Sequence, residues 1–138
     1  MSRSENSLDT KAVPITGGAR RIGATIARVL HTAGMDVIVH YRHSADAALA
    51  LQEELHAHRP GSVTLCQADL TNSGACETLT QCAHQAFGRL DALINNASAF
   101  YPTPVDRATE AQWEDLFAVN LKAQFFLAQA WAPMLAMH

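Results

Sequence analysis

The sequence is poor in cysteine, which argues against the protein classes that depend on disulfides or zinc. It has three cysteines, and Cys66, Cys76 and Cys82 form no Cys-x-x-Cys pair. An odd number without that spacing is the pattern of neither a disulfide framework nor a zinc site. All three lie among apolar residues, so we expect them to be reduced and buried in the core.

Positive charge and long apolar runs are also scarce. Ten Lys and Arg against 13 Asp and Glu give a net charge of -3, so no basic stripe is available to bind nucleic acid or an anionic membrane. The segment from Met1 to Thr10 lacks the basic start and apolar run of a secretory signal, and no stretch reaches the roughly 18 apolar residues of a membrane span. We expect a cytoplasmic protein with neither nucleic acid nor membrane as a partner.

Histidine is plentiful, with seven residues, but its spacing does not indicate a metal site. His56 and His58 lie at a polar helix end, and His31 and His84 lie on expected helix surfaces. No third ligand converges with either pair. We therefore expect no bound metal.

Apolar runs and helical stripes alternate along the chain. Its 138 residues and 49% hydrophobic content suit one domain with a real core, and we expect a flexible leader over residues 1–10 followed by a domain over 11–138. Apolar runs predict strands over 11–15, 37–39, 62–67 and 90–94. Helical spacing predicts helices over 22–33, 44–58, 71–87 and 111 to about 137, the last bent or ended by Pro133.

Strands that alternate with helices require parallel crossover connections. We therefore predict the α/β fold class: a doubly wound parallel sheet of the Rossmann type, its N-terminal portion having about four strands with helices on both faces. Pro14 falls within the first strand, where the loss of a backbone donor predicts a late strand start or a bulge.

A glycine-rich turn, Thr16 to Gly23, joins the first expected strand to the first expected helix. Gly17 and Gly18 let the chain turn sharply and approach a ligand, and Gly23 lets the helix pack closely on the strand. The unpaired N–H groups and the dipole at a helix N-terminus both favour a pyrophosphate. A purely structural turn is the alternative, but the position between strand and helix favours a dinucleotide site.

The end of the second expected strand reads His40-Tyr41-Arg42-His43-Ser44. An NAD site usually has a carboxylate there, to bind the ribose 2′-hydroxyl. Here a guanidinium, hydroxyls and imidazoles can surround a 2′-phosphate, with Arg20 or Arg21 approaching from the glycine turn. NADP(H) is the predicted cofactor. The alternative is that Arg42 and His43 are solvated loop residues and Ser44 is only a helix cap.

These residues resemble the short-chain dehydrogenase/reductase family, whose glycine motif is Thr-Gly-x-x-x-Gly-x-Gly. Arg21 stands at the sixth position of that motif. With His40-Tyr41, Ser44, the segment Asn95 to Ser98 and the segment Phe100 to Pro104, it is similar to the pteridine reductase branch. The resemblance covers residues 12 to 135 and only the front half of a typical member.

The resemblance implies roles for residues beyond the glycine turn. Asp69 would reach the adenine amino group, and Asn120 would bend the last helix and hold a water linked to a catalytic lysine. Phe100 would stack on a pterin ring, with Ser98 and Arg21 offering polar contacts. The expected cofactor-binding residues are Gly17, Arg20, Arg21, Ile22, His40, Tyr41, Arg42, His43, Ser44, Asp69, Leu70, Asn96, Ala97 and Ser98.

Two of these roles have structural alternatives. Asp69 could bond only backbone amides at a strand end, and Phe100 could be an ordinary loop or interface aromatic. The order Arg42-His43 also reverses the His-Arg of the pteridine reductases, which leaves open the side chain that binds the phosphate.

The catalytic tyrosine of the resembled family is followed four positions later by lysine, and neither Tyr41 nor Tyr101 has that lysine. We therefore expect this chain to be truncated before the catalytic region and to be inactive by itself. The principal hypothesis is an NADPH-dependent reductase of dihydropterin- or dihydrofolate-type substrates, which the resemblance implies is a homo-oligomer. The alternatives are another short-chain reductase, such as a 3-oxoacyl thioester reductase, and a non-catalytic NADP-binding or dimerisation fragment.

Overall fold

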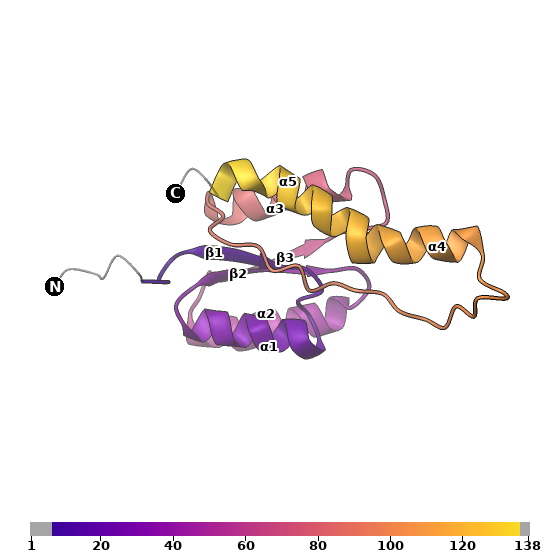
Figure 1. Cartoon of the computed structure of the whole chain (residues 1–138). Coiled ribbons are helices and arrows are strands. Elements are labelled where there is room, and N and C mark those ends of the chain that lie inside the picture. The colour runs from indigo at the N-terminus through magenta and orange to yellow at the C-terminus, as the bar shows by residue number, and fades with distance from the viewer. Residues whose placement is uncertain (1–6, 136–138) are drawn as a thin grey trace.

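A parallel β-sheet lies at the centre of the computed structural model, which describes residues 7–135 (Figure 1). The sheet contains β1 (Ala12–Ile15), β2 (Asp36–Tyr41) and β3 (Val63–Gln67), in the order β1-β2-β3. Both pairs are parallel, and the register aligns Val13 with Val37 and Val37 with Val63. The predicted α/β class with a parallel, Rossmann-type sheet is confirmed.

Helices cover both faces of this sheet. Figure 1 shows α1 (Arg21–Thr32) and α2 (Ala45–His58) on one face, with α3 (Ala75–Phe87) and α5 (Ala123–Leu135) on the other. Because successive side chains point to opposite faces of a strand, each strand contributes side chains to two hydrophobic cores. Val37 and Val39 pack in the α1–α2 core, and Ile38 between them packs in the core with Leu127 and Trp131 of α5.

The fourth predicted strand, over residues 90–94, is present as one isolated bridge between Ile15 and Ile94 and not as a ladder. Ala12 donates its N–H to Asp91 Oδ2 at 2.8 Å, and Thr16 donates its N–H to the Ile94 carbonyl at 3.0 Å. Pro14 lies two residues from each of them, so its backbone nitrogen faces the same segment but carries no hydrogen. The prediction of a full strand was wrong because the proline interrupts the ladder at its middle.

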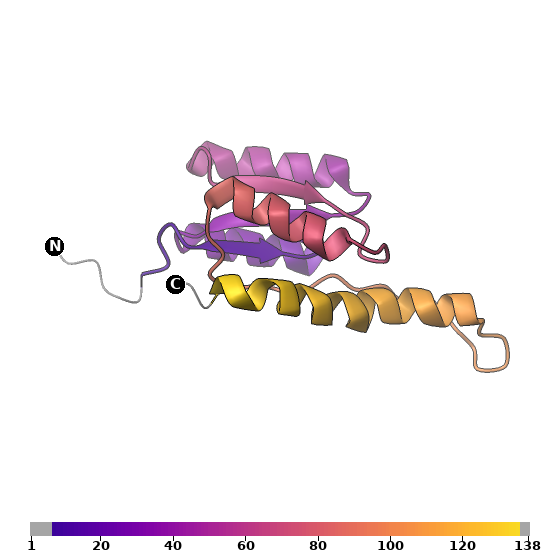
Figure 2. The same cartoon turned by 90° about the horizontal axis from the view of Figure 1, so that it is seen from above.

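The long helix predicted over residues 111 to about 137 is divided. It consists of α4 (Glu110–Phe117), a π-helical turn (Ala118–Lys122) and α5, which follow one another along one rod in Figure 2. A π turn is typical of functional positions within helices. Pro133 does not end α5, which continues to Leu135, and Met137 lies outside the described residues.

The prediction of three reduced cysteines was also wrong. Cys66 on β3 and Cys82 on α3 form a disulfide, with Cα atoms 6.2 Å apart, and only Cys76 is free. The pairing depends on α3 crossing over β3, which no local pattern in the sequence indicates. Burial raises the pKa of the Cys76 thiol.

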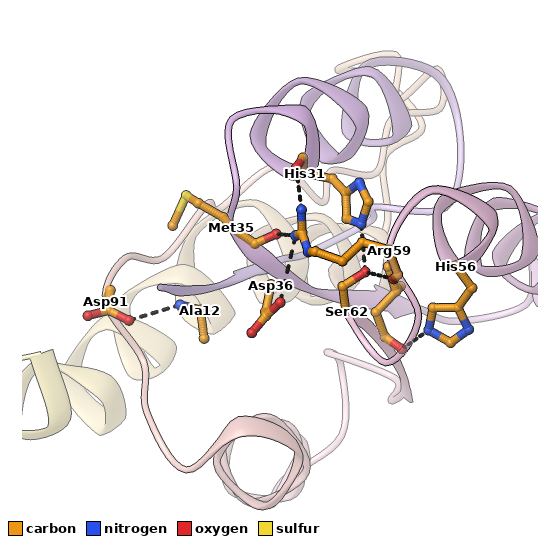
Figure 3. Close-up of polar contacts among 9 residues, drawn as sticks. Ala12, His31, Met35, Asp36, His56, Arg59, Ser62 and Asp91 are labelled. Carbon is orange, nitrogen blue, oxygen red and sulfur yellow. Dashed lines mark hydrogen bonds and ion pairs between the residues drawn. The ribbon is translucent and has the colours of Figure 1, made fainter. Parts of the chain in front are cut away.

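At the N-terminal ends of the strands, Arg59 joins three segments (Figure 3). Its Nη1 donates to the His31 carbonyl at 3.0 Å and its Nη2 to the Met35 carbonyl. The Ser62 hydroxyl donates to the Arg59 carbonyl at 2.5 Å and lies 2.6 Å from His31 Nε2, so the imidazole donates to that hydroxyl. Burial, followed by the field of Arg59, lowers the pKa of His31. The polar groups of Arg59, His31 and Ser62 are therefore used in contacts within the chain.

Part of the predicted flexible leader, residues 1–6, lies outside the described residues. The Thr10 amide donates to the Gly34 carbonyl at 3.1 Å. Among the helices of residues 7–135, none is long and apolar enough to cross a membrane.

A buried hydrogen bond joins α5 to α3. Trp131 is fully buried, and its indole N–H donates to the hydroxyl of Thr80. That hydroxyl in turn donates to the Cys76 carbonyl at 2.7 Å. The two helices are therefore held by a specific polar contact as well as by apolar packing.

Replacing Thr80 by valine should lower the free energy of unfolding by about 1–3 kcal/mol, because the buried indole N–H then has no acceptor. Thr78→Val is the matched control, since Thr78 is exposed on the same helix. Urea unfolding followed by tryptophan fluorescence measures both. Equal losses in the two variants would contradict a specific role for the Thr80 hydroxyl.

Candidate functional site: an anion-binding cleft at the C-terminal ends of the strands

The turn between β1 and α1 requires glycine at three positions, Gly17, Gly18 and Gly23. Gly17 has φ +60°, and a Cβ there would lie 3.1 Å from the Ala97 Cα. A Cβ on Gly23 would lie 2.2 Å from the Gly17 carbonyl oxygen and 2.7 Å from Asn96 Nδ2. These contacts leave no room for a side chain, so the turn brings bare backbone against the neighbouring segment.

Arg21 adopts the left-handed backbone conformation that usually belongs to glycine. Its φ is +51°, and α1 begins at this residue. For a residue with a side chain this conformation costs about 1–2 kcal/mol. This strained residue lies at the start of α1 and in the lining of the cleft described below. Backbone strain at such a position is a candidate functional feature.

The N-terminus of α1 has no capping side chain. Arg20 occupies the N-cap position without a side-chain cap hydrogen bond, and the first turn contains no acidic residue. The first amides of a helix have no partner within the helix, and the dipole makes this end positive. The start of α1 is thus suited to a phosphate or another anion.

Thr16 joins the glycine turn to the segment after residue 94. Its hydroxyl oxygen accepts hydrogen bonds from the amides of Asn96 and Ala97, each at 2.9 Å. In return, Asn96 Nδ2 donates to the carbonyls of Thr16 and Gly17, each at 3.1 Å. The floor of the cleft is therefore made of two segments that fix each other.

A second polar group lies where β2 and β3 end. Arg42 Nη2 is 3.0 Å from Asp69 Oδ2, while Asp69 Oδ1 accepts from the Thr71 hydroxyl at 2.7 Å and from the Thr71 amide at 2.9 Å. These bonds from Thr71, with the charge of Arg42, hold the pKa of Asp69 below its usual range. Asp69 is therefore ionised at neutral pH and orients the guanidinium of Arg42.

His40 is buried beneath the glycine turn, with 3% of its surface exposed. Its Nδ1 lies 3.0 Å from the Gly17 amide nitrogen, and its Nε2 lies 2.8 Å from the Ala68 carbonyl oxygen. Burial lowers the pKa of His40, and the Ala68 carbonyl partly opposes this. Both ring nitrogens are thus used by the protein itself.

These elements surround a cleft of about 500 Å³, within the usual range for small-molecule sites. Eleven of the fourteen predicted cofactor residues line it: Gly17, Arg20, Arg21, Ile22, His40, Arg42, Asp69, Leu70, Asn96, Ala97 and Ser98. Tyr41, His43 and Ser44 were predicted but do not line it.

Four lining residues were not among the predicted site residues: Gly23, Ala68, Ala99 and Val119. Gly23 and Ala68 directly adjoin predicted residues, so extending each motif by one position would have found them. Val119 comes from the π-helical turn, and no sequence signal placed that turn beside the glycine loop.

Asn120 acts on the cleft indirectly. Its Oδ1 accepts from the Ala99 amide at 3.0 Å, and its Nδ2 donates to the Ala99 carbonyl at 2.8 Å. The side chain therefore pins one peptide of the wall but does not line the cleft. Phe100, the next residue, is 88% exposed and also lies outside the lining. The substrate and catalytic roles given to Ser98, Phe100 and Asn120 stay predictions.

Tyr101 is held outside the cleft by a hydrogen bond to α4. Its hydroxyl donates to Asp115 Oδ2 of α4 at 2.9 Å, and it is not among the lining residues. This contact anchors the loop before α4. It also removes Tyr101 from the groups that can deliver a proton within the cleft.

The left-handed backbone of Arg21 can be measured with two variants that remove the same guanidinium. Arg21→Gly should have a free energy of unfolding about 1 kcal/mol above that of Arg21→Ala, because glycine adopts φ +51° without the steric penalty. Urea denaturation of both variants gives the difference. An alanine variant as stable as the glycine variant would show that residue 21 carries no such strain.

Comparison with known proteins places this cleft in context. Residues 11–138 match the sequence profile of the short chain dehydrogenase family. Pteridine reductase 1 of Leishmania tarentolae is 35% identical, over 88% of this chain and 53% of that protein. A 3-oxoacyl-(acyl-carrier-protein) reductase of Staphylococcus aureus is 32% identical, over 91% of this chain and 51% of that protein.

A solved structure agrees with the sequence relatives. A blue fluorescent protein from a metagenomic library, in complex with NADPH, superposes with a TM-score of 0.85 at 31% identity, over 91% of this chain and 51% of that chain. The chain thus spans about half the length of the proteins it matches. With a family profile that covers the cleft and both helical layers, this chain belongs to the short-chain dehydrogenase/reductase family.

Proposed function

We propose that this chain is the cofactor-binding half of an NADP(H)-dependent reductase of pterin- or folate-type substrates. The observation that carries the cofactor assignment is the cleft itself: the helix at its edge has an uncapped N-terminus, and Arg20, Arg21 and Arg42 are among its lining residues. A dinucleotide with three phosphates is the ligand that this charge arrangement suits best.

The preference for NADP(H) over NAD(H) follows from the end of β2. The residue after that strand is Arg42 and not a carboxylate, and an NAD site usually needs a carboxylate there. Asp69 holds one nitrogen of the Arg42 guanidinium at 3.0 Å. The other donors of this planar group would be available to a 2′-phosphate.

The residues of this chain bind and orient, while the reducing equivalent comes from the cofactor. Bound NADPH would supply a hydride from its nicotinamide ring. The amides at the start of α1 would hold the pyrophosphate, and Asp69 with Leu70 would bound the adenine end of the cleft. Ser98 and the pinned Ala99 would bound the other end, where the reaction would take place.

Protonation of the substrate has no donor among the residues of this cleft. The sequence contains no Tyr-x-x-x-Lys, and the Tyr101 hydroxyl is bonded to Asp115. General acid catalysis is worth about 10²–10⁴-fold in rate. We therefore propose that the 138-residue chain binds cofactor but turns over substrate poorly by itself.

Two observations support a pterin-type substrate. Pteridine reductase 1 is among the curated relatives, at 35% identity. Phe100 directly follows the pinned Ala99 and is 88% exposed, so an aromatic face is available beside the cleft for a planar heterocycle to stack on.

We further propose a cytoplasmic enzyme that assembles as a homo-oligomer through its exposed aromatic residues on α4 and α5.

A second candidate activity is the reduction of a 3-oxoacyl thioester, which the Staphylococcus aureus relative favours. A third is a non-catalytic NADP-binding or dimerisation fragment. Trp113, Phe117 and Phe125 are exposed along α4 and α5 and provide the surface for the latter. The cofactor site is common to all three candidates.

Arg42→Ala tests the cofactor assignment. Binding of NADPH to the 138-residue chain, followed by the fluorescence of the reduced nicotinamide, should weaken by about 10–100-fold, because one charge-assisted contact to the 2′-phosphate is lost. NADH binding should change by less than about threefold. Arg28→Ala is the control, since Arg28 is exposed on α1 and pairs with Glu54. A wild-type chain that binds neither nucleotide would refute the proposed function.

Phe100→Ala tests the substrate assignment. In the product of the complete gene, oxidation of NADPH with dihydrobiopterin should lose about tenfold or more in kcat/KM, because the stacking platform is removed. Val105→Ala, in the same exposed loop, is the control. Turnover with a 3-oxoacyl thioester and none with dihydrobiopterin or dihydrofolate would replace the pterin proposal by the second candidate.

A further inference from the structure

His40 contacts the glycine turn twice. Its main-chain carbonyl accepts the Gly18 N–H at 2.9 Å, and its ring nitrogen Nδ1 lies 3.0 Å from the Gly17 nitrogen. On the other side of the ring, Nε2 lies 2.8 Å from the Ala68 carbonyl oxygen. Ala68 directly precedes Asp69. One side chain thus joins the phosphate end of the proposed cofactor site to its adenine end.

These two contacts determine the protonation state of the ring. The Gly17 amide is a donor, so Nδ1 must carry a lone pair. The Ala68 carbonyl is an acceptor, so Nε2 must carry the hydrogen. The imidazole is therefore neutral, in its Nε2–H form. Histidine is the one side chain that accepts at one edge and donates at the other in this geometry.

From these contacts, we propose that His40 is a positioning residue of the cofactor site, which holds the glycine turn only while its ring is neutral, so that NADPH binding weakens in acid. This inference rests on the proposed function. It differs from the role implied by family resemblance, in which His40 binds the cofactor directly, because both ring nitrogens already bond the chain.

The consequence for the cofactor follows from the donor at Gly17. Protonated Nδ1–H faces the Gly17 N–H, so two donors oppose each other and the hydrogen bond is lost. Gly17 then loses the contact that holds its φ of +60°, and Arg20 and Arg21, a few residues later, lose their fixed position. The amides at the start of α1 would no longer be arranged to meet a phosphate.

Charged residues line the cleft beside His40. Arg42 follows its own strand, and Arg20 and Arg21 lie on the turn and at the start of α1; these three line the same cleft. Asp69, after β3, is the one carboxylate of the lining, and it is paired with Arg42. Cys66, its register partner on β3, is in a disulfide and does not titrate. Burial, and not a neighbouring charge, is the first cause of the lowered pKa of His40.

The direction of the pH effect follows from linkage. Burial lowers the pKa of His40 below its usual value, so the folded chain binds this proton less readily than the unfolded chain does. The stabilisation is fully present above the usual imidazole pKa of about 6.5 and is lost as the pH falls through the lower folded value. NADPH affinity should decline over the same range.

Two substitutions test the contacts of the two ring nitrogens of His40 one at a time. His40→Asn places an amide oxygen near the position of Nδ1 and can keep the Gly17 bond, and His40→Gln places an amide N–H near Nε2 and can keep the Ala68 bond. NADPH and NADH titrations at about pH 8, and in steps from about pH 6.5 down to about pH 4.5, cover the range below the usual imidazole value in which the His40 ring is expected to protonate. His84→Asn is the control, since His84 is exposed on α3.

At the higher pH, His40→Gln should weaken NADPH binding by about tenfold and His40→Asn by less than about threefold, since one hydrogen bond to the turn is lost only in the first. Across that pH series, wild type and His84→Asn should lose more affinity than His40→Asn does, by about tenfold once the pH is one unit below the pKa of the His40 ring, for both nucleotides. An equal pH dependence in wild type and His40→Asn would overturn the proposal.

A measurement without cofactor separates this inference from the proposed function. In ¹⁵N-labelled wild-type chain at neutral pH, long-range ¹H–¹⁵N correlations should show the Nε2–H form of His40, and the Gly17 amide resonance should titrate with the His40 ring. An Nδ1–H form, or a Gly17 amide resonance that does not change during the titration, would refute the proposed His40 contacts to Gly17 and Ala68. If wild type fails to bind NADPH while the His40 contacts to Gly17 and Ala68 are present, the proposed function and the acid effect on binding are refuted. The structural role of His40 then stands.

Discussion

The hydroxyl of Thr16 is the contact on which the candidate site depends. It accepts the amides of Asn96 and Ala97, and the Asn96 side chain returns two bonds to the carbonyls of Thr16 and Gly17. The segment that ends at Ile94 is paired with β1 by a single bridge, because Pro14 interrupts the ladder. Without this reciprocal set of bonds, the glycine turn and the opposite wall of the cleft would have no fixed relation to each other.

The rest of the cleft is an arrangement of positive charge around this frame. The start of α1 contributes unpaired amides and its dipole, and Arg21 is held there in a backbone conformation that is unfavourable for its side chain. Asp69 is ionised and orients Arg42, while His40 supports the turn from below with a neutral ring. Strain, burial and an ion pair thus all act on one small volume, as is common where a protein binds a charged ligand.

The two ends of the sheet differ in how their polar groups are used. At the N-terminal ends, Arg59, His31 and Ser62 bond one another and the backbone (Figure 3), so these polar groups are already satisfied by the protein. At the C-terminal ends, the first amides of α1 and the arginines face a cleft of about 500 Å³. Ligands of open parallel α/β sheets bind at this latter end, and the distribution of satisfied and available groups in this chain agrees with that rule.

Much of the fold and part of the site could be predicted from the sequence, because the signals are local. Alternating apolar runs indicated the parallel sheet, and glycines between a strand and a helix indicated the phosphate turn. Arg42 directly follows β2 and Asp69 comes two residues after the end of β3, which puts both at one edge. Each of these inferences depends on residues that are neighbours in the chain, or on strand direction, which a short motif already contains.

The remaining features were decided by tertiary structure, since they join residues that are distant in sequence. Pro14 disrupts a strand only because its nitrogen faces the 90–94 segment, and the Cys66–Cys82 disulfide exists only because α3 crosses β3. Asn120 reaches the cleft through the Ala99 peptide. His40 became a bridge because Gly17 and Ala68 lie on opposite edges of its ring. The sequence by itself determined the fold class and the charge of the site. The packing decided which polar groups form hydrogen bonds within the protein and which remain available to a ligand.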